Sequence, residues 1–310
     1  MLNVFVTARS FGIYDKEAIK LLEDNGIQVE RSPIEGPLSE SEILSLVEGR
    51  SIDALLVGAD EITAQVIKNV KDLKVVSMHG SGLDRIDIKS AEEMGVEVTS
   101  AAGLNAIAVA ELAIGLLLCL ARKIPMANSS TKSGKWEKII GNSLANKTLG
   151  LVGLGDIGKK VASLAHGFEM NIIAHDLYVQ KAAEYITMVE LDECLVNSDY
   201  LSLHVPLVDG TKNLINKDKL KLMKPEACLI NTSRGGIINE NDLYESLKNR
   251  EIAGAALDVL AIEPIDQNHP LSYLDNCILT PHIGGRTEEV VKAVSCKAAQ
   301  NIIDVLKRHN

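Results

Sequence analysis

Three glycines near the middle of the 310-residue chain have the types and spacing that could bind a phosphate group. Gly153, Gly155 and Gly158 are spaced G-x-G-x-x-G between an apolar β-type run, 148–152, and an amphipathic segment that begins near Asp156. The first glycine allows a tight turn, the second lets the backbone approach a pyrophosphate, and the third lets a helix pack on a strand. The helix N-terminus also offers free N–H groups to an anion. Tight turns use glycine for steric reasons as well, so the motif alone leaves both interpretations open.

A carboxylate at the end of the next strand-like run, 171–176, makes the phosphate interpretation more specific. Asp176 lies where a side chain accepts hydrogen bonds from an adenosine ribose in dinucleotide sites. The same carboxylate would repel a 2′-phosphate, so we expect NAD rather than NADP as the cofactor. The simpler interpretation of Asp176 is a polar residue that ends a strand, and its combination with the glycines favours the functional one.

The composition excludes several classes of function. A net charge of −10 and only 3% aromatic residues argue against a nucleic-acid surface, which would be basic and would carry stacking platforms. The longest apolar run, 106–121, is too short to span a bilayer, and the N-terminal stretch lacks the pattern of a signal peptide. The five cysteines and seven histidines show no zinc-type spacing, so we expect no metal site and free thiols in a reducing cytoplasm.

Strand-like and helix-like segments alternate in two series along the chain. An apolar helix is predicted at 106–121 between the series, and an amphipathic helix at 288–308 ends the chain. This alternation predicts parallel sheets with helices on both faces. We therefore expect an α/β protein with two doubly wound parallel-sheet domains: a Rossmann-type NAD domain, 100–284, inserted into a smaller flavodoxin-like substrate domain, 1–99 plus 285–310. The predicted strands are 3–7, 28–30, 54–57, 74–77 and 96–99, then 150–152, 171–174, 200–203, 228–231, 254–257 and 278–279.

Together with the glycine turn, four further stretches resemble the D-isomer-specific 2-hydroxyacid dehydrogenase family. They are LHVPL at 203–207, INTSRGG at 230–236, ALDVLAIEP at 256–264 and LTPHIGG at 279–285. MHGSGLD at 78–84 and VAE at 109–111 resemble the family's substrate loop and long interdomain helix. The motifs occur in family order over nearly the whole chain, and the N-terminal half is most similar to the D-3-phosphoglycerate dehydrogenase branch.

The resemblance implies a catalytic set of Arg234, Glu263 and His282. A guanidinium such as that of Arg234 can hold a substrate carboxylate through two hydrogen bonds and polarise the adjacent carbonyl. His282 would protonate the carbonyl oxygen as a hydride arrives, because imidazole exchanges protons near neutral pH. Glu263 would pair with His282, orient its ring and favour its charged form. Singly, each residue has an ordinary structural alternative, and their occurrence in family order favours the catalytic interpretation.

The resemblance also implies residues that bind the cofactor and the substrate. It places the backbone of Ser81 and Gly82 near the substrate carboxylate. For His204 the alternative of a core histidine stays open. The implied cofactor residues are Asp156, Ile157, His204, Pro206, Thr211, Thr232, Ser233, Asp258 and Gly284, in addition to the three motif glycines and Asp176.

Two departures from the family pattern bear on the ligands. Asp156 stands where many members carry arginine beside the pyrophosphate, which we expect to weaken NAD binding. An arginine that would hold a substrate phosphate is expected at 57–58 and is absent, and Lys135 or Lys138 could replace it. The sequence therefore predicts a 2-keto acid/D-2-hydroxy acid oxidoreductase and leaves its substrate open.

D-3-phosphoglycerate dehydrogenase of serine biosynthesis and a hydroxypyruvate or glyoxylate reductase are the two specific alternatives for that activity. An NAD(H)-sensing, corepressor-like interaction protein ranks below both. We expect a homodimer through the NAD domain, with the helix 106–121 and the segment 124–146 at the contact.

Overall fold

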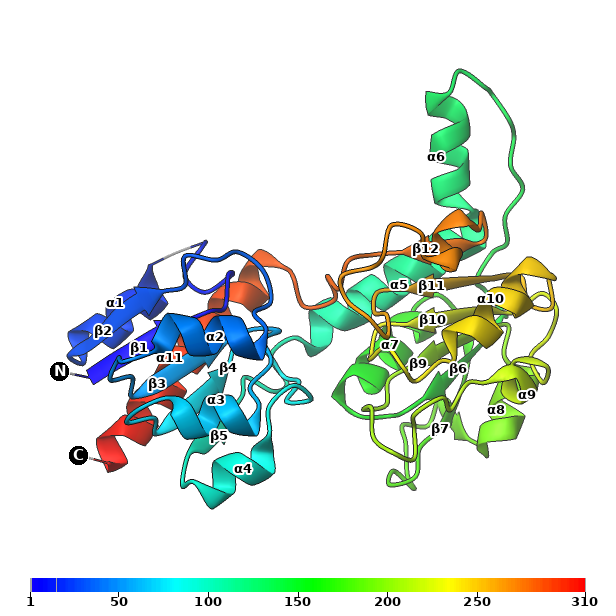
Figure 1. The fold of residues 1–310 in the computed structure, drawn as a ribbon. Coiled ribbons are helices and arrows are strands. Elements are labelled where there is room, and N and C mark those ends of the chain that lie inside the picture. Colours follow the sequence, from blue (N-terminus) through cyan, green and yellow to red (C-terminus); the bar gives the residue numbers. More distant parts are fainter. Residues whose placement is uncertain (1, 15, 310) are drawn as a thin grey trace. The chain divides into compact units, whose positions relative to one another are not determined.

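The computed structural model of the protein describes residues 2–14 and 16–309, and it divides into two compact units (Figure 1). Unit 1 comprises Met1–Asn105 with Gly285–Asn310, and unit 2 comprises Ala106–Gly284. Met1 and Asn310, which belong to the predicted smaller domain, lie outside the described residues. Unit 2 is thus inserted in the sequence of unit 1.

Unit 1 contains a five-stranded parallel sheet in the order β2-β1-β3-β4-β5, which is the flavodoxin-like order. Its strands are β1 (Leu2–Val6), β2 (Ile27–Arg31), β3 (Ala54–Val57), β4 (Val75–Met78) and β5 (Glu97–Thr99). Its helices are α1 (Glu17–Asp24), α2 (Glu40–Val47), α3 (Ala64–Asn69), α4 (Ile88–Glu93) and α11 (Glu288–Arg308).

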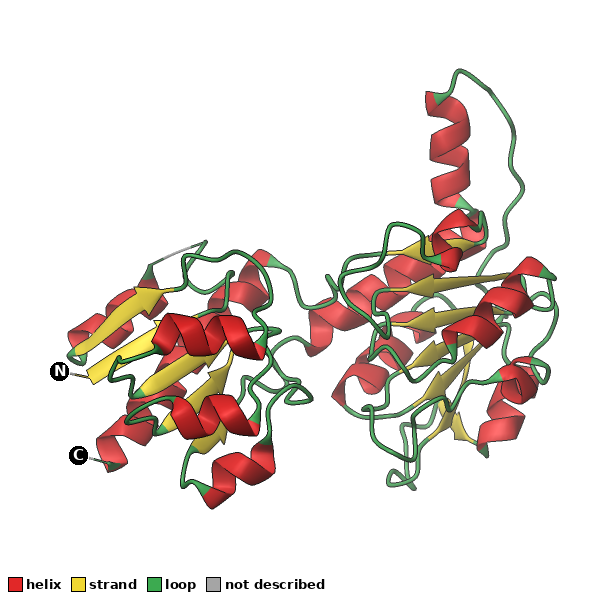
Figure 2. Cartoon of the chain, viewed as in Figure 1, coloured by secondary structure: helices red, strands yellow, loops and turns green. Residues whose placement is uncertain are grey.

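Helices cover both faces of the unit 1 sheet (Figure 2). Alternating side chains of its strands build two separate cores, one on each face. Val4 and Val6 of β1 pack with residues of α1 and α11, whereas Phe5 between them packs with residues of α2 and α3. This alternation follows from the two-residue period of a strand. The C-terminal helix α11 is capped by the Thr287 hydroxyl, which accepts a hydrogen bond from Val290 N–H at 3.3 Å.

One boundary between the units differs from the predicted one. Residues 100–105 belong to unit 1, whereas the sequence analysis assigned them to the NAD domain. Three hydrogen bonds explain the difference. Ala101 N–H donates to Gly80 O at 2.8 Å, Asn301 Nδ2 to Ser100 O at 3.0 Å, and Asn105 Nδ2 to Ser81 Oγ at 3.4 Å.

Unit 2 contains a seven-stranded parallel sheet in the order β12-β11-β10-β9-β6-β7-β8, a Rossmann-type order with one additional strand. Its strands are β6 (Thr148–Val152), β7 (Asn171–His175), β8 (Ile186–Met188), β9 (Tyr200–Leu203), β10 (Cys228–Asn231), β11 (Gly254–Leu257) and β12 (Cys277–Leu279). Its helices are α5 (Ala106–Arg122), α6 (Ile124–Lys132), α7 (Asp156–His166), α8 (Leu191–Asn197), α9 (Lys217–Leu220), α10 (Glu240–Lys248) and the 3₁₀ helix η1 (Pro270–Tyr273).

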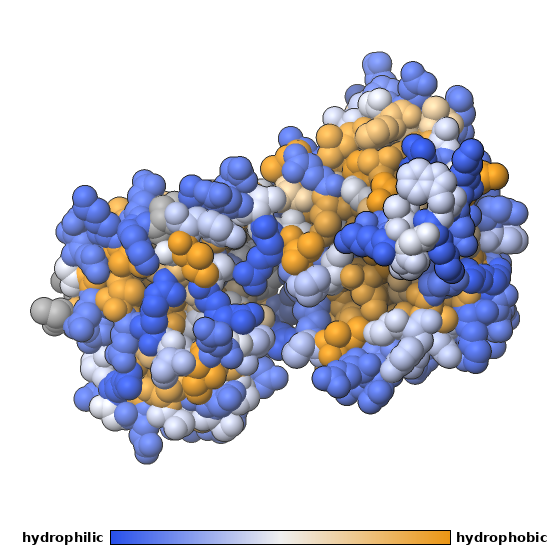
Figure 3. Space-filling model, turned by 90° about the horizontal axis from the view of Figure 1, so that it is seen from above, coloured by the Kyte–Doolittle hydropathy of each residue, from blue (hydrophilic) through white to orange (hydrophobic). Residues whose placement is uncertain are grey.

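Helix α6 and the strand-free segment after it project from the body of unit 2 (Figure 1). Space-filling atoms show groups of hydrophobic side chains on the surface of this unit (Figure 3). Exposed apolar residues of the projecting segment are Ile124, Met126, Trp136 and Ile140, and Trp136 is 83% exposed. All four are at least 43% exposed within the described part of the chain.

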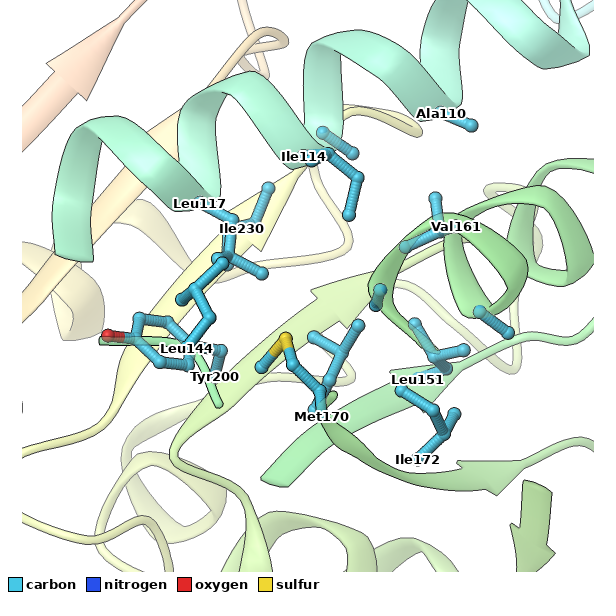
Figure 4. Close-up of a cluster of buried hydrophobic side chains, with 14 of the residues drawn as sticks. Ala110, Ile114, Leu117, Leu144, Leu151, Val161, Met170, Ile172, Tyr200 and Ile230 are labelled. Atoms are coloured by element: carbon cyan, nitrogen blue, oxygen red, sulfur yellow. The ribbon is translucent and has the colours of Figure 1, made fainter. Parts of the chain in front are cut away.

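One of the two cores of unit 2 joins the strand before the glycine turn to the helix after it (Figure 4). Leu151 of β6 and Val161 of α7 meet Ile114 and Leu117 of α5 in this cluster. The opposite face of the same sheet buries Val152, Leu203 and Leu257 against α8, α9 and α10. The strand before the turn and the helix after it are therefore both anchored in apolar contacts, which fixes the turn between them.

The structure confirms the predicted fold class of two doubly wound parallel-sheet units. Among the described residues, no helix is long and apolar enough to cross a bilayer.

Candidate active site

The carboxyl ends of the unit 2 strands lie in register along one edge of the sheet. Val152 pairs with His175 on one side and with Leu203 on the other, and pairing continues from Leu203 through Asn231 and Leu257 to Leu279. Ligands of open α/β sheets bind outside this edge. The residues that directly follow the strands, in order across the edge, are Asp176, Gly153, His204, Thr232, Asp258 and Thr280.

Two of the three motif glycines are required by the fold itself. Gly153 has a φ of +98°, and a Cβ on it would lie 2.5 Å from His204 O. A Cβ on Gly158 would lie 2.2 Å from Gly153 O. Both distances are far below van der Waals contact with backbone, so neither position can carry a side chain without moving the turn.

Gly155 is different, because the fold gives no reason for a glycine there. Its φ is −73°, which any residue adopts, and a Cβ on it would meet no atom of the described chain within 4 Å. Gly155 is exposed and directly precedes α7, whose N-terminus has no side-chain cap among the described residues. A position kept free of a side chain at a helix N-terminus fits the close approach of a pyrophosphate.

The first turn of α7 carries Asp156 and Ile157. Asp156 is exposed, so its carboxylate places a negative charge at the anion-binding end of the helix. Ile157 packs against the core cluster that holds β6 and α5.

Asp176 ties the glycine turn to the end of β7. Its Oδ2 accepts a hydrogen bond from Leu154 N–H at 2.7 Å, and its Oδ1 accepts from Tyr178 and Val179 N–H at 2.8 and 2.9 Å. Burial raises the pKa of this carboxyl, but the three backbone donors outweigh burial, so that the pKa is lowered overall. Asp176 is therefore ionised at neutral pH and has a structural role in the turn beside its predicted role at the ribose.

Two buried polar atoms at this edge lack a hydrogen-bond partner within the described chain. They are His204 Nδ1 and Thr232 Oγ1. His204 Nε2 lies 2.9 Å from Ser202 Oγ, and burial lowers the pKa of His204 to about 4, so its ring is neutral at physiological pH. Buried polar atoms are rarely left unsatisfied, and a polar ligand at this edge would supply the partners.

The turn after β10 is organised by Asn231. Its Oδ1 accepts from Ser233 N–H at 3.0 Å and from the Ser233 hydroxyl at 2.7 Å, and its Nδ2 donates to Arg234 O at 2.8 Å. Arg234 is half-buried, and one of its Nη atoms donates to Ser233 O at 2.8 Å. A Cβ on Gly235 would lie 2.0 Å from the carbonyl carbon of Leu260, so this turn packs directly on the segment that leads to Glu263.

Asp258 fixes the loop after β12. Its Oδ1 accepts from the Thr280 hydroxyl at 2.6 Å and from Ile283 N–H at 2.8 Å, and its Oδ2 accepts from Gly284 N–H at 2.8 Å. Asp258 is 1% exposed. The loop also closes through His282 N–H, which donates to Asp258 O at 2.9 Å, with His282 held at a φ of +53°.

His282 and Glu263 form a hydrogen-bonded pair in this loop. His282 Nδ1 lies 2.8 Å from Glu263 Oε2, and Glu263 Oε1 accepts from Leu260 N–H at 3.1 Å. An ionised carboxylate only accepts, so Nδ1 carries the hydrogen of the pair and Nε2 is the ring atom available for proton exchange. The His282 side chain is 51% exposed and that of Glu263 28%. This is the arrangement of a general acid–base with an orienting carboxylate.

Pro206 and Thr211 belong to the loop after β9. The Thr211 hydroxyl donates to Pro206 O at 2.6 Å and accepts from Val208 N–H at 2.9 Å. The two residues thereby brace this loop.

Ser81 and Gly82 belong to unit 1, in the loop after β4, where Asn105 Nδ2 reaches Ser81 Oγ. All other predicted site residues lie in unit 2. Asn231 and Thr280 are site residues that were not predicted, although a lone asparagine at the end of the apolar run 228–231 is a visible signal.

The chain is similar to known proteins along nearly its whole length. Residues 114–284 match the family model described as "D-isomer specific 2-hydroxyacid dehydrogenase, NAD binding domain". A D-3-phosphoglycerate dehydrogenase of Methanocaldococcus jannaschii is 41% identical over 299 residues, which cover 94% of this chain and 56% of that protein. A hydroxypyruvate reductase of Thermotoga maritima is 39% identical, with 94% of this chain and 95% of that protein covered.

The fold comparison agrees with the sequence comparison. The crystal structure of the TT0316 protein from Thermus thermophilus superposes with a TM-score of 0.90 at 33% identity, covering 99% of this chain and 97% of that chain. The chain spans about half the length of the phosphoglycerate dehydrogenases that it matches, 56% in each of two archaeal proteins.

Proposed function

The chain belongs to the D-isomer-specific 2-hydroxyacid dehydrogenase family, and on this premise we propose that it is an NAD-dependent oxidoreductase that interconverts a 2-keto acid and a D-2-hydroxy acid. The observation that carries the proposal is the His282–Glu263 pair at 2.8 Å, on the same sheet edge as a glycine turn with an open position at Gly155. A proton-exchanging group and a dinucleotide cradle on one edge are what a hydride-transfer reaction requires.

The residues of unit 2 fit NAD. Gly155 leaves room for the pyrophosphate at the N-terminus of α7, and the ionised Asp176 favours a ribose that has no 2′-phosphate. The unpartnered His204 Nδ1 and Thr232 Oγ1 would receive hydrogen bonds from the bound cofactor or give them to it. Bound NAD supplies the hydride acceptor for alcohol oxidation or, when reduced, the hydride donor for keto reduction.

We assign the proton chemistry to His282. In the reducing direction its Nε2 gives a proton to the carbonyl oxygen of the substrate, and in the oxidising direction it takes the hydroxyl proton. Glu263 keeps the ring in the tautomer with hydrogen on Nδ1 and stabilises the ring when it is charged. Asp258 acts through the loop 280–284, since its carboxylate accepts three hydrogen bonds from that loop.

We assign substrate binding to Arg234 and to the backbone of Ser81 and Gly82. Arg234 follows β10, where Asn231 fixes its backbone carbonyl. A guanidinium there can hold the carboxylate of the substrate through two parallel hydrogen bonds and draw electron density from the neighbouring carbonyl.

For the substrate itself, we propose D-3-phosphoglycerate or its keto form first, and hydroxypyruvate or glyoxylate second. Similar proteins named for each of these acids are 39–41% identical to this chain. The choice turns on the group attached beyond the second carbon of the acid.

A substrate panel tests the proposal. Purified protein is mixed with NADH and, in turn, 3-phosphohydroxypyruvate, hydroxypyruvate, glyoxylate and pyruvate, and NADH oxidation is followed. We expect turnover on at least one acid, and we expect His282→Ala to lower kcat by about 10²- to 10⁴-fold while leaving NADH binding unchanged. His309→Ala, which removes a histidine of unit 1, is the matched control. Wild-type protein that binds NADH but oxidises it with none of the acids would refute the proposed activity.

We also propose that the protein is cytoplasmic and forms a homodimer through α5 and the segment 124–146. The exposed apolar residues Ile124, Met126, Trp136 and Ile140 support a protein partner for this projecting segment. Light scattering should give twice the chain mass, and Trp136→Glu should shift it toward one chain mass. Wild-type protein that scatters as a monomer at micromolar concentration would contradict the dimer.

A further inference from the structure

We propose that unit 1 has an anion-binding site at the carboxyl edge of its sheet, with the Arg9 guanidinium as its main cation. This site selects 2-keto and 2-hydroxy acids that carry a second anionic group, a phosphate or a sulfonate. The inference rests on the proposed function, which supplies the 2-keto or 2-hydroxy acid part of the substrate. The strand order β2-β1-β3-β4-β5 reverses between β1 and β3, and ligands of such sheets bind at the carboxyl edge where the order reverses. Arg9 follows β1 at this point.

The loop that carries Arg9 is fixed on both sides of it. Thr7 and Ala8 N–H both donate to Leu56 O, at 3.0 and 3.3 Å, and each residue is at most 5% exposed. Phe11 is fully buried, and its ring packs edge-on against the ring of His79 with the centroids 6.1 Å apart. Arg9 is the one exposed residue between Thr7 and Gly12. A rigid loop therefore presents a single guanidinium to solvent.

His79 anchors this loop from the end of β4. Its Nδ1 lies 3.3 Å from Ser10 Oγ, and its Nε2 lies 2.9 Å from Ser295 Oγ of α11. Burial and, to a smaller extent, the positive charges of Arg286 and Arg31 together lower the pKa of His79 to about 4. His79 is therefore a neutral hydrogen-bonding partner of Ser10 and Ser295, and the Arg31 and Arg286 side chains place positive charge near it.

A second guanidinium, that of Arg85 from the segment between β4 and α4, contacts the turn after β3. A Cβ on Gly58 would lie 3.5 Å from Ala8 Cα, so this turn adjoins the Arg9 loop. On its other side, an Nη atom of Arg85 donates to Ala59 O at 3.2 Å, and Arg85 is exposed. The phosphate-binding arginine that was expected at 57–58 is absent, and Arg9 and Arg85 flank that position instead.

The buried acid of this edge does not neutralise these cations. Asp60 is 1% exposed, and its carboxylate accepts from Gly58 N–H and Leu38 N–H, both at 2.8 Å, and from the Thr7 hydroxyl. Its charge is thus directed into the fold. No hydrogen bond or ion pair engages the Arg9 guanidinium within residues 2–14 and 16–309. A planar guanidinium fork matches two oxygens of a phosphate or sulfonate, whereas a hydroxymethyl or methyl group offers it no charge to bind.

The experiment compares acids that differ in the distal group. NADH oxidation is measured with 3-phosphohydroxypyruvate and 3-sulfopyruvate, which are anionic there, and with hydroxypyruvate and pyruvate, which are not. We expect Arg9→Met to raise KM about tenfold or more for the anionic acids that the wild type accepts, with kcat unchanged and with unchanged constants for the neutral acids. If the wild type turns over only 3-phosphohydroxypyruvate, the distal group is a phosphate; if it turns over only 3-sulfopyruvate, the distal group is a sulfonate.

The matched control is Arg50→Met, which removes an exposed arginine of the same unit that precedes β3 and pairs with Glu30. It should change none of the constants. An equal effect of Arg9→Met on anionic and neutral acids, or no effect on either, would overturn the site.

Failure of the proposed function can be told apart from failure of the site. If the wild type oxidises NADH with none of the acids, binding of 3-phosphoglycerate and of glycerate is measured by calorimetry. Preferential binding of 3-phosphoglycerate that Arg9→Met weakens about tenfold would keep the site. No such binding, or equal binding by the two proteins, would exclude it.

Discussion

Replacing Gly155 by alanine should separate folding from cofactor binding. The added Cβ would meet no atom of the described chain within 4 Å, and the φ of −73° suits alanine. Alanine is less favourable than glycine at the residue that precedes a helix, which lowers the free energy of unfolding. Alanine also reduces the conformational entropy of the unfolded chain, which raises the free energy of unfolding. The two effects are each about 0.5–1 kcal/mol and oppose each other. We therefore expect the free energy of unfolding to change by less than about 1 kcal/mol.

The same methyl group would occupy the space through which a pyrophosphate approaches the N-terminus of α7. Losing a hydrogen bond to a charged group costs about 1.5–3 kcal/mol, which corresponds to about a 10- to 100-fold rise in the Kd for NADH. The assay is fluorescence titration of NADH, with thermal unfolding measured in parallel.

Gly158→Ala is the matched comparison, because its Cβ would lie 2.2 Å from Gly153 O. Overpacking of this kind costs about 1–3 kcal/mol or more, so this variant should lose thermal stability. A folded Gly155→Ala protein that binds NADH as tightly as the wild type would refute the assignment of this open position to the cofactor.

Three further variants test the electrostatics of the site. Asp156→Asn removes a negative charge from the first turn of α7. It should lower the Kd for NADH severalfold, most clearly at low salt concentration, because salt screens the charge. An affinity for NADH equal to that of the wild type at every salt concentration would contradict this role of Asp156. Asp258→Asn replaces a carboxylate that accepts three hydrogen bonds from the loop of His282. The variant should have a free energy of unfolding lower by about 1–3 kcal/mol, and its kcat should fall because the loop is held less firmly. A denaturation midpoint equal to that of the wild type would contradict this role of Asp258. The pKa of His204 is about 4 in the folded unit, whereas an unfolded histidine takes up its proton near pH 6.5. The contribution of neutral His204 to the free energy of unfolding is therefore fully present above pH 6.5, and it is lost as the pH falls toward 4. That contribution is on the order of 3 kcal/mol, and His204→Gln should flatten the fall in the denaturation midpoint between these pH values; identical slopes for the two proteins would exclude it.

The sequence predicts the strands that build the site well, because they are short apolar runs bounded by polar or glycine-rich turns. The predicted strands 54–57, 200–203, 228–231 and 254–257 agree with β3, β9, β10 and β11. In a parallel sheet all of these strands end at the same edge, and the residues that follow them must therefore lie in one row. The row itself was predictable once the strands were known.

Other elements leave weaker signals. β8 has three residues at the sheet margin, too few to show a periodic pattern. The segment 124–146 was interpreted as irregular, yet 124–132 forms α6. Its serines, threonine and asparagine are poor helix formers, while Pro125 is tolerated in the first turn of a helix.

The network of hydrogen bonds that orders the site could not be predicted from spacing. Asp258, which follows β11, accepts a hydrogen bond from Gly284 N–H in the loop after β12. Asn231 at the end of β10 donates a hydrogen bond to Arg234 O in the turn that follows. These contacts depend on side-chain directions that the chain acquires only when the sheet forms. Likewise Arg9 is far in sequence from 57–58, and the contact between Ala8 and Gly58 reveals its relation to the missing arginine. The catalytic roles of Arg234, Glu263 and His282 stay predictions.

The chirality of the product shows whether the protein is a D-2-hydroxyacid dehydrogenase. The protein is incubated with NADH and the best 2-keto acid of the panel, and the 2-hydroxy acid formed is resolved by chiral chromatography. We expect the D isomer alone, formed in proportion to the NADH consumed. Formation of the L isomer, or NADH consumption without a hydroxy acid product, would contradict it.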